Sequence, residues 1–194
     1  MGENIFFNYK SEVEPSDGCL LVSEPHLPDS NFERTVILLC KHDATGSFGF
    51  VLNRKSNLSL EELMQDATGL TNPIFVGGPV EQNTLHFIHQ DNTLPHAEPV
   101  NDSFYWGGNF ELLLTWLKEN IADGNRVKFF LGYSGWGAGQ LMDEIKENSW
   151  IVLKPDNVDF LFTESGDDMW KNILEELGGR FSMYSKYPVD PRLN

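Results

Sequence analysis

The stretch GYSGWGAGQLMDEI, from Gly132 to Ile145, decides how the second half of this chain folds. The apolar run that starts at Val127 leads into it and predicts a strand, and its last residues begin a helical pattern. Glycines occupy positions 135, 137 and 139 between the two. Such a segment has three possible explanations: a nucleophile elbow, a phosphate-binding loop, or a turn that the fold itself requires.

A nucleophile elbow needs the pattern G-x-S-x-G, because a side chain at either flanking position crowds the tight turn. Gly132 and Ser134 fit this pattern, but Trp136 stands where the final glycine belongs. The elbow also needs a histidine later in the chain, and the last histidine is His96. The sequence therefore disfavours a serine hydrolase that uses Ser134, and we expect no catalytic residue here.

A dinucleotide-binding loop needs G-x-G-x-x-G between a strand and a helix. Gly135 and Gly137 supply the first half, but Gln140 replaces the third glycine. The chain that follows is also too short for the remaining strands of a dinucleotide-binding domain. A weak anion site at the start of the helix stays open, since free N–H groups there favour negative charge.

The third explanation, a turn that the fold itself requires, does not depend on any residue that the sequence lacks. Glycine allows sharp turns and close backbone contacts, and Tyr133 and Trp136 can anchor such a turn by burial. We therefore predict a strand-to-helix turn from Gly132 to Gln140, with Trp136 mostly buried. At least one of the glycines at 135, 137 and 139 should have a positive φ angle.

The rest of the chain predicts a mixed sheet with helices packed on it. Short apolar runs rich in β-branched and aromatic residues predict strands at Gly18 to Ser23, Thr35 to Lys41, Phe48 to Asn53, Ile74 to Val76, Leu85 to His89, Trp150 to Leu153 and Val158 to Phe162. A capping-box pattern at Ser59, an apolar stripe between Asn109 and Gly124, and a second stripe from Trp170 to Leu177 predict helices. No linker divides the chain, so we expect one domain over residues 1–194, with a core of about 14–180 and an irregular tail at 181–194.

Composition limits the function classes. The formal net charge is −15 and the basic residues are scattered singly, whereas duplex binding needs clustered Lys and Arg. We therefore expect no direct nucleic-acid binding, and an anionic membrane surface is disfavoured for the same reason. Cys19 and Cys40 both lie in apolar runs, which is typical of buried, reduced thiols in a cytoplasmic protein.

Other polar residues give weaker signals. His86 and His89 should point to opposite faces of a strand, so we expect no metal site. Paired carboxylates lie on or next to predicted helices, where adjacent side chains diverge, and we interpret them as solvated. Arg34 and Arg54 flank two buried-looking strands; each can hold a carboxylate within the fold or line a pocket.

Taken together, these stretches resemble the AlgH/YqgE family of bacterial proteins. The resemblance covers roughly residues 14 to 180 and rests on five ordered motifs: GCLLVSEP from Gly18, FERTVI from Phe32, GFVLNR from Gly49, GGPV from Gly77 with Leu85-His86, and GYSGWGAGQL from Gly132. Met142 departs from the acidic residue that follows in many members, and the FYWGGNFE segment around Gly107 is also unlike the commoner pattern.

The resemblance implies an α/β (α+β) fold: a mixed, strongly bent sheet forms a partly closed barrel, and helices pack outside it. It implies no reaction and no cofactor, and the family carries the label of a transcriptional regulator. We expect a non-enzymatic regulatory or interaction protein that acts through an unknown protein partner. The alternative is a small-ligand or anion binder, possibly an enzyme. In either case the candidate surface consists of Arg34, Asn53, Arg54, Gly77, Gly78, Pro79, Tyr133, Ser134, Gly135, Trp136, Gly137 and Gln140.

Overall fold

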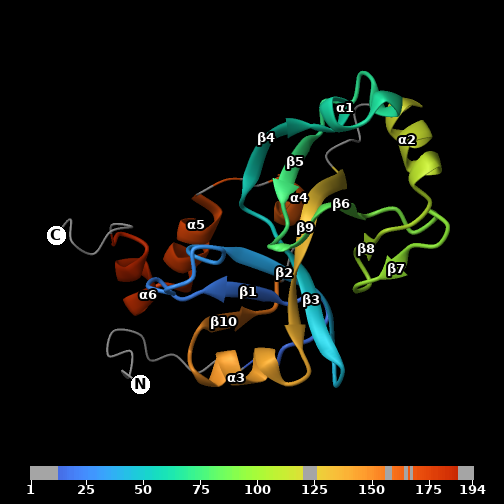
Figure 1. The fold of residues 1–194 in the computed structure, drawn as a ribbon. Helices are drawn as coiled ribbons and strands as arrows, with labels where there is room; N and C mark the ends of the chain where they lie inside the picture. The colour runs from blue at the N-terminus through green and yellow to red at the C-terminus, as the bar shows by residue number, and fades with distance from the viewer. Residues whose placement is uncertain (1–12, 120–125, 156–158, 164–165, 167, 188–194) are drawn as a thin grey trace.

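The computed structural model of the chain describes residues 13–119, 126–155, 159–163, 166 and 168–187. Within these ranges ten strands form one mixed sheet with helices packed against it (Figure 1). The strands are β1 (Leu20–Ser23), β2 (Val36–Asp43), β3 (Gly46–Val51), β4 (Lys55–Ser59), β5 (Pro73–Val76), β6 (Val80–His89), β7 (Glu98–Pro99), β8 (Tyr105–Trp106), β9 (Val127–Gly137) and β10 (Trp150–Leu153).

The helices of the described residues lie between these strands and, for the last three, after β10. They are α1 (Leu60–Leu63), the 3-10 helix η1 (Gln65–Ala67), α2 (Phe110–Glu119), α3 (Gln140–Lys146), α4 (Asp159–Thr163), α5 (Asp168–Leu177) and α6 (Gly179–Tyr184). In Figure 1, α5 and α6 lie on one side of β1 and β2, α3 lies beside β10, and α1 and α2 lie at the opposite end of the molecule.

Strand β9 is the centre of the sheet. One edge pairs with β6, while the other pairs in parallel with β5 up to Leu131 and antiparallel with β3 from Ser134 onward. The strand continues to Gly137, so the prediction that a turn starts at Gly132 is wrong for most of that segment. Glycine within a strand marks close backbone approach as well as turns, and the sequence did not distinguish the two.

The sheet is open rather than a partly closed barrel. Its strand order is β10-β1-β2-β3-β9-β6-β8-β7, with β4 and β5 off this path, and no pairing between the described residues joins β10 to β7. Closure needs edge strands of matched length and stagger, and β7 has only two residues. The mixed α/β class is confirmed, whereas the expected barrel is wrong.

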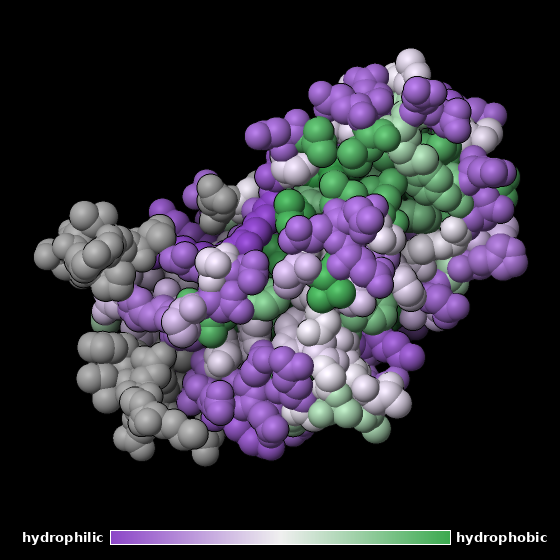
Figure 2. All heavy atoms as spheres, viewed as in Figure 1, coloured by the Kyte–Doolittle hydropathy of each residue, from purple (hydrophilic) through white to green (hydrophobic). Residues whose placement is uncertain are grey.

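Alternating side chains send apolar groups to both faces of the sheet. In β1, Leu20 and Val22 join the core beneath α4, α5 and α6, while Leu21 joins the core beneath α3. A third core lies between β5, β6, β9 and the helices α1 and α2. Figure 2 shows apolar side chains gathered near α1 and α2, where half-buried residues such as Leu85 and Leu131 pack against that core.

Several local predictions are confirmed. Ser59 caps α1 in a capping box, and its N–H donates to the Glu62 carboxylate at 2.7 Å. The apolar stripe of α2 buries Leu113, Leu114 and Leu117; its expected end at Gly124 lies outside the described residues. Among the described helices, none has the length and hydropathy that crossing a bilayer requires.

Two local predictions are wrong. The expected strand from Val158 to Phe162 is helix α4 over its described part, because a short apolar run fits a buried helix turn as well as a strand. The expected irregular tail begins with helix α6, which buries Phe181 and Tyr184. Two apolar residues three positions apart make one helical turn, which is too short to show a period.

Candidate functional site

The GGPV and GYSG motifs meet where the backbone of one crosses the other. A Cβ atom on Gly77 would lie 2.3 Å from the Gly132 carbonyl oxygen, and one on Gly78 would lie 2.3 Å from the Tyr133 carbonyl. Gly132 has a φ of +68°, which glycine adopts at little cost. The Ser134 hydroxyl is fully buried and donates to the Gly77 carbonyl at 3.1 Å. These glycines therefore allow the close backbone contacts at the point where the partner of β9 changes from β5 to β3. The Ser134 hydroxyl is inaccessible to a substrate because it is buried.

Arg34, Asn53 and Arg54 tie backbone segments together. Asn53 accepts from the Val36 N–H at 3.0 Å and donates to the Arg34 carbonyl at 2.8 Å. The Arg34 guanidinium lies 5.1 Å from the Trp170 ring centroid and donates to the Tyr187 carbonyl. Arg54 donates to the carbonyl of Ser30 at 2.8 Å. In these contacts the arginines hold carbonyl groups, where the sequence suggested a carboxylate, and none of the three lines the pocket described below.

Trp136 and Gln140 belong to a hydrogen-bond network that joins β9, α3 and β10. One oxygen of Glu144 accepts from the indole N–H groups of Trp136 at 2.8 Å and Trp150 at 2.7 Å. The Gln140 amide donates to the other Glu144 oxygen at 2.9 Å and accepts from the Gly137 N–H at 3.0 Å. Trp136 is only 6% exposed, so its predicted burial is confirmed. The interpretation of Glu144 as a solvated carboxylate missed this network, because helical spacing does not show partners on other elements.

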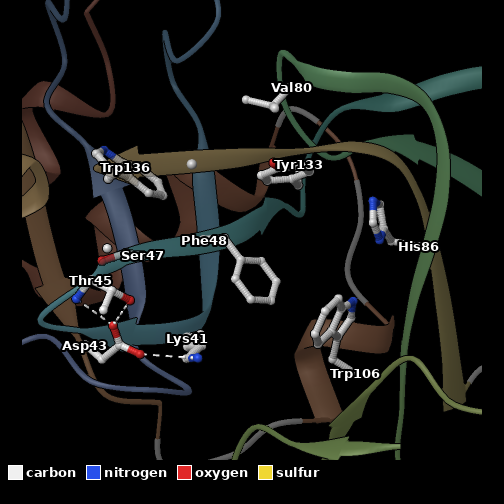
Figure 3. A pocket seen from close by; sticks show the side chains of 12 residues that line it. Lys41, Asp43, Thr45, Ser47, Phe48, Val80, His86, Trp106, Tyr133 and Trp136 are labelled. Atoms are coloured by element: carbon white, nitrogen blue, oxygen red, sulfur yellow. Dashed lines mark hydrogen bonds and ion pairs between the residues drawn. The ribbon is translucent and has the colours of Figure 1, made fainter. Parts of the chain in front are cut away.

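A pocket of about 630 Å³ lies at the end of the β2–β3 hairpin. It combines residues from β2, β3, β6, β8 and β9 (Figure 3). Of the predicted candidate residues, Tyr133, Gly135 and Trp136 line it. The remaining lining residues are Lys41, Asp43, Thr45, Gly46, Ser47, Phe48, Val80, His86 and Trp106.

Aromatic rings form the inner wall of this pocket. Phe48 contacts Trp106 with ring centroids 4.7 Å apart and Tyr133 with centroids 6.2 Å apart. His86 completes the wall, 5.8 Å from the Tyr133 ring and 6.4 Å from the Trp106 ring. All four side chains are half-buried, so each keeps part of its surface available to a ligand.

Charged and hydroxyl groups form the rim. Lys41 pairs with Asp43 at 3.2 Å, and the Asp43 carboxylate also accepts from the backbone and hydroxyl of Thr45. The side-chain hydrogen bond from Thr45, followed by its backbone N–H and by Lys41, lowers the pKa of Asp43 to about 2. Asp43 is therefore ionised at neutral pH, and the rim carries a negative charge on Asp43 beside the positive charge of the exposed Lys41.

His86 and His89 lie on opposite faces of β6, as predicted. The buried His89 ring contacts the Gly107 carbonyl at 2.9 Å and accepts from the Asp91 N–H at 3.2 Å. His86 reaches the pocket, and its buried Nε2 has no hydrogen-bond partner among the described residues. Burial lowers the pKa of His86, so its ring is neutral at pH 7. Within the described ranges, no group of His, Cys, Asp and Glu is arranged to hold a metal ion.

The hydroxyl–imidazole contact at this rim does not form a catalytic triad. The Ser47 hydroxyl lies 2.6 Å from His42 Nδ1 across the hairpin. A triad needs an acid that orients the imidazole ring, but Asp17 accepts from the backbone N–H of His42. The contact between Ser47 and His42 therefore ties β2 to β3 at the end of the hairpin.

The fold and the pocket define a mixed α/β protein with an open sheet and an aromatic pocket at one hairpin. The chain belongs to the AlgH-like family, whose model matches residues 20–182. A relative from Cytophaga hutchinsonii is 42% identical, covering 91% of this chain and 98% of its own length, and one from Parabacteroides distasonis is 42% identical, covering 99% and 98%. Both carry the name UPF0301 protein, which assigns no reaction.

Two solved structures resemble this fold over most of its length. A Corynebacterium diphtheriae protein has a TM-score of 0.74 at 21% identity, covering 90% of this chain and 94% of that one. The AlgH protein from Pseudomonas aeruginosa has a TM-score of 0.69 at 24% identity, covering 92% and 98%. At this identity the likeness concerns the fold alone.

Sequence reasoning missed most of the pocket. Phe48 was placed on a strand and His86 was considered as a metal ligand, while Trp106 lies in the segment that departs from the commoner family pattern. Besides the predicted candidates Tyr133, Gly135 and Trp136, the unusual aromatic run that ends at Trp106 was a signal for a pocket residue. It could not indicate which distant residues would join it.

Proposed function

We propose that this chain is a non-enzymatic interaction protein whose recognition element is the aromatic pocket at the β2–β3 hairpin. The observation that supports this is the combination of about 630 Å³ of volume with four half-buried rings and a rim formed by Lys41, Asp43, Thr45 and Ser47. Ligand sites typically have about 300–1,000 Å³, apolar or aromatic walls and a small number of polar groups that fix orientation.

A fragment titration tests this proposal. The purified chain is mixed with cationic, anionic and neutral aromatic fragments, and binding is followed by chemical shifts of the indole N–H groups. We expect at least one fragment to bind, and Trp106→Ala to abolish the binding. Trp116→Ala is the matched control, because Trp116 is also a half-buried indole but packs in the core beneath α2.

The proposal fails if no fragment binds, or if Trp116→Ala removes binding as effectively as Trp106→Ala. Circular dichroism on both variants shows whether they remain folded. A variant that unfolds is replaced by the corresponding Trp→Phe substitution, which keeps the apolar volume and weakens the ring contact.

A regulatory role would run through a protein partner and not through operator contact. The support for this is the net charge of −15, from 29 acidic and 14 basic residues, because duplex binding depends on clustered positive charge. We place this role in the bacterial cytoplasm, since both cysteines are buried free thiols and reduced thiols are typical of that compartment.

A further inference from the structure

The planes of the rings that line the pocket are inclined to one another, three of the four neighbouring pairs by more than 60°. Phe48 is inclined by 81° to Tyr133 and by 61° to Trp106, and His86 is inclined by 85° to Tyr133. The fourth neighbouring pair, His86 and Trp106, is tilted by 35°. Figure 3 shows these side chains converging from different strands around the hollow. The wall is therefore a cup of rings that lie in different planes.

A cup of this shape suits a rounded ligand better than a flat one. A planar ring is held best between two parallel faces, and none of these four neighbouring pairs is parallel. The electron-rich faces of Trp, Tyr and Phe attract cations within about 6 Å of the ring centre, and quaternary ammonium groups are the recurring ligands of such cages. Methyl groups on the nitrogen also reduce the cost of leaving water, because they bury apolar surface.

Charge at and around the rim favours the same class of ligand. Asp43 lines the pocket as an ionised carboxylate. The whole chain carries a net charge of −15, and a field of one sign raises the local concentration of counter-ions. An anionic ligand would be repelled both by the Asp43 carboxylate and by the net negative charge of the chain.

Lys41 is the competing cation. Its Nζ lies 3.2 Å from Asp43, and its side chain is 59% exposed. A bound cation therefore shares or takes over the Asp43 carboxylate. Removing Lys41 should strengthen the binding of a cation and weaken the binding of an anion, so the sign of this one effect identifies the class of ligand.

We infer that the pocket binds a small organic cation with an alkylated ammonium group, held by Phe48, Trp106 and Tyr133 and paired with Asp43. This inference rests on the proposed function, because it names the ligand class of the same pocket. Its test compares choline and tetramethylammonium with 3,3-dimethyl-1-butanol, the uncharged carbon isostere of choline, and with benzoate as an aromatic anion. Affinities come from chemical-shift titration or calorimetry at low salt.

We expect choline and tetramethylammonium to bind the parent protein and the neutral isostere to bind at least ~5-fold more weakly. Trp106→Ala should reduce choline affinity by ~10-fold or more. Asp43→Asn should also weaken choline, whereas Lys41→Met should tighten it by ~2–5-fold, the range of an exposed ion pair. The controls are Lys146→Met and Asp143→Asn, which remove the exposed ion pair of α3 with the same charge changes and should leave affinity within twofold.

Equal binding of choline and its neutral isostere would overturn the inference, as would weaker choline binding by Lys41→Met. If Asp43→Asn disturbs the hairpin by losing its Thr45 contacts, the Lys41→Met result still decides. Binding of benzoate or a neutral fragment without choline, lost in Trp106→Ala, refutes the cation inference but supports the proposed function. If no probe binds, both proposals fail.

Discussion

Replacing Trp136 with alanine is expected to destabilise the protein strongly. The indole is 6% exposed and packs in the core beneath α3, with its ring centroid 6.3 Å from Phe32 and 5.9 Å from Trp150. Truncating a buried tryptophan to alanine typically costs about 3–5 kcal/mol, through lost burial and the cavity left behind. The substitution also removes one of the two indole donors to Glu144.

Two further variants provide comparisons for the loss of stability in Trp136→Ala. Trp136→Phe keeps most of the apolar volume but loses the bond to Glu144, and we expect a cost of about 1.5–2 kcal/mol, the lower part of the range for a hydrogen bond to a charged group. Glu144 is only partly buried and keeps Trp150 and Gln140, so its carboxylate is not orphaned. Trp106→Ala removes a half-buried indole from the pocket and should cost less than Trp136→Ala.

Urea unfolding of the parent and each variant measures these differences. The midpoint should fall in Trp136→Ala while the slope m stays constant, which shows that stability changed and not the compactness of the unfolded chain. For a domain of this size the melting temperature should drop by roughly 6–20 °C. A loss below about 1 kcal/mol, small for a core truncation, would refute the structural interpretation of this tryptophan. Trp136 would then be studied for binding, since it also lines the pocket.

Three other predictions follow from the same structure. Burial lowers the pKa of Lys128 from 10.5 to about 7, so between pH 7 and 10 the unfolded chain binds more protons than the folded one. The free energy of unfolding of the parent, compared with that of Lys128→Met, should therefore rise between pH 7 and 9 by up to about 1.4 kcal/mol per pH unit. A difference between the two proteins that does not change with pH would contradict this. Because β9 pairs with both β3 and β5, calorimetry should show one cooperative transition with equal calorimetric and van't Hoff enthalpies, and two resolved transitions would disprove a single domain. With a net charge of −15, the isolated chain should not shift a duplex in a gel at physiological salt with competitor DNA, and a retained complex with one DNA sequence would refute indirect action.

The sequence by itself determined the features that depend on neighbours along the chain. The apolar runs of β1, β2 and β3, the capping box at Ser59 and the buried stripe of α2 are all local patterns. The burial of Trp136 and the positive φ of Gly139, which is 77°, also follow from residue type and local spacing. Ordered motifs along most of the chain were enough to indicate the family.

Only the tertiary structure decided what the glycine motifs do and where the pocket lies. Gly77 and Gly132 are 55 positions apart in sequence, and only strand pairing shows that their backbones cross. The pocket joins Phe48, His86, Trp106 and Tyr133 from four strands, and no period or spacing relates them. A pattern records local periodicity, whereas a site of this kind depends on which distant strands pair and in which register. For that reason the open sheet and the aromatic cup could be found only in three dimensions.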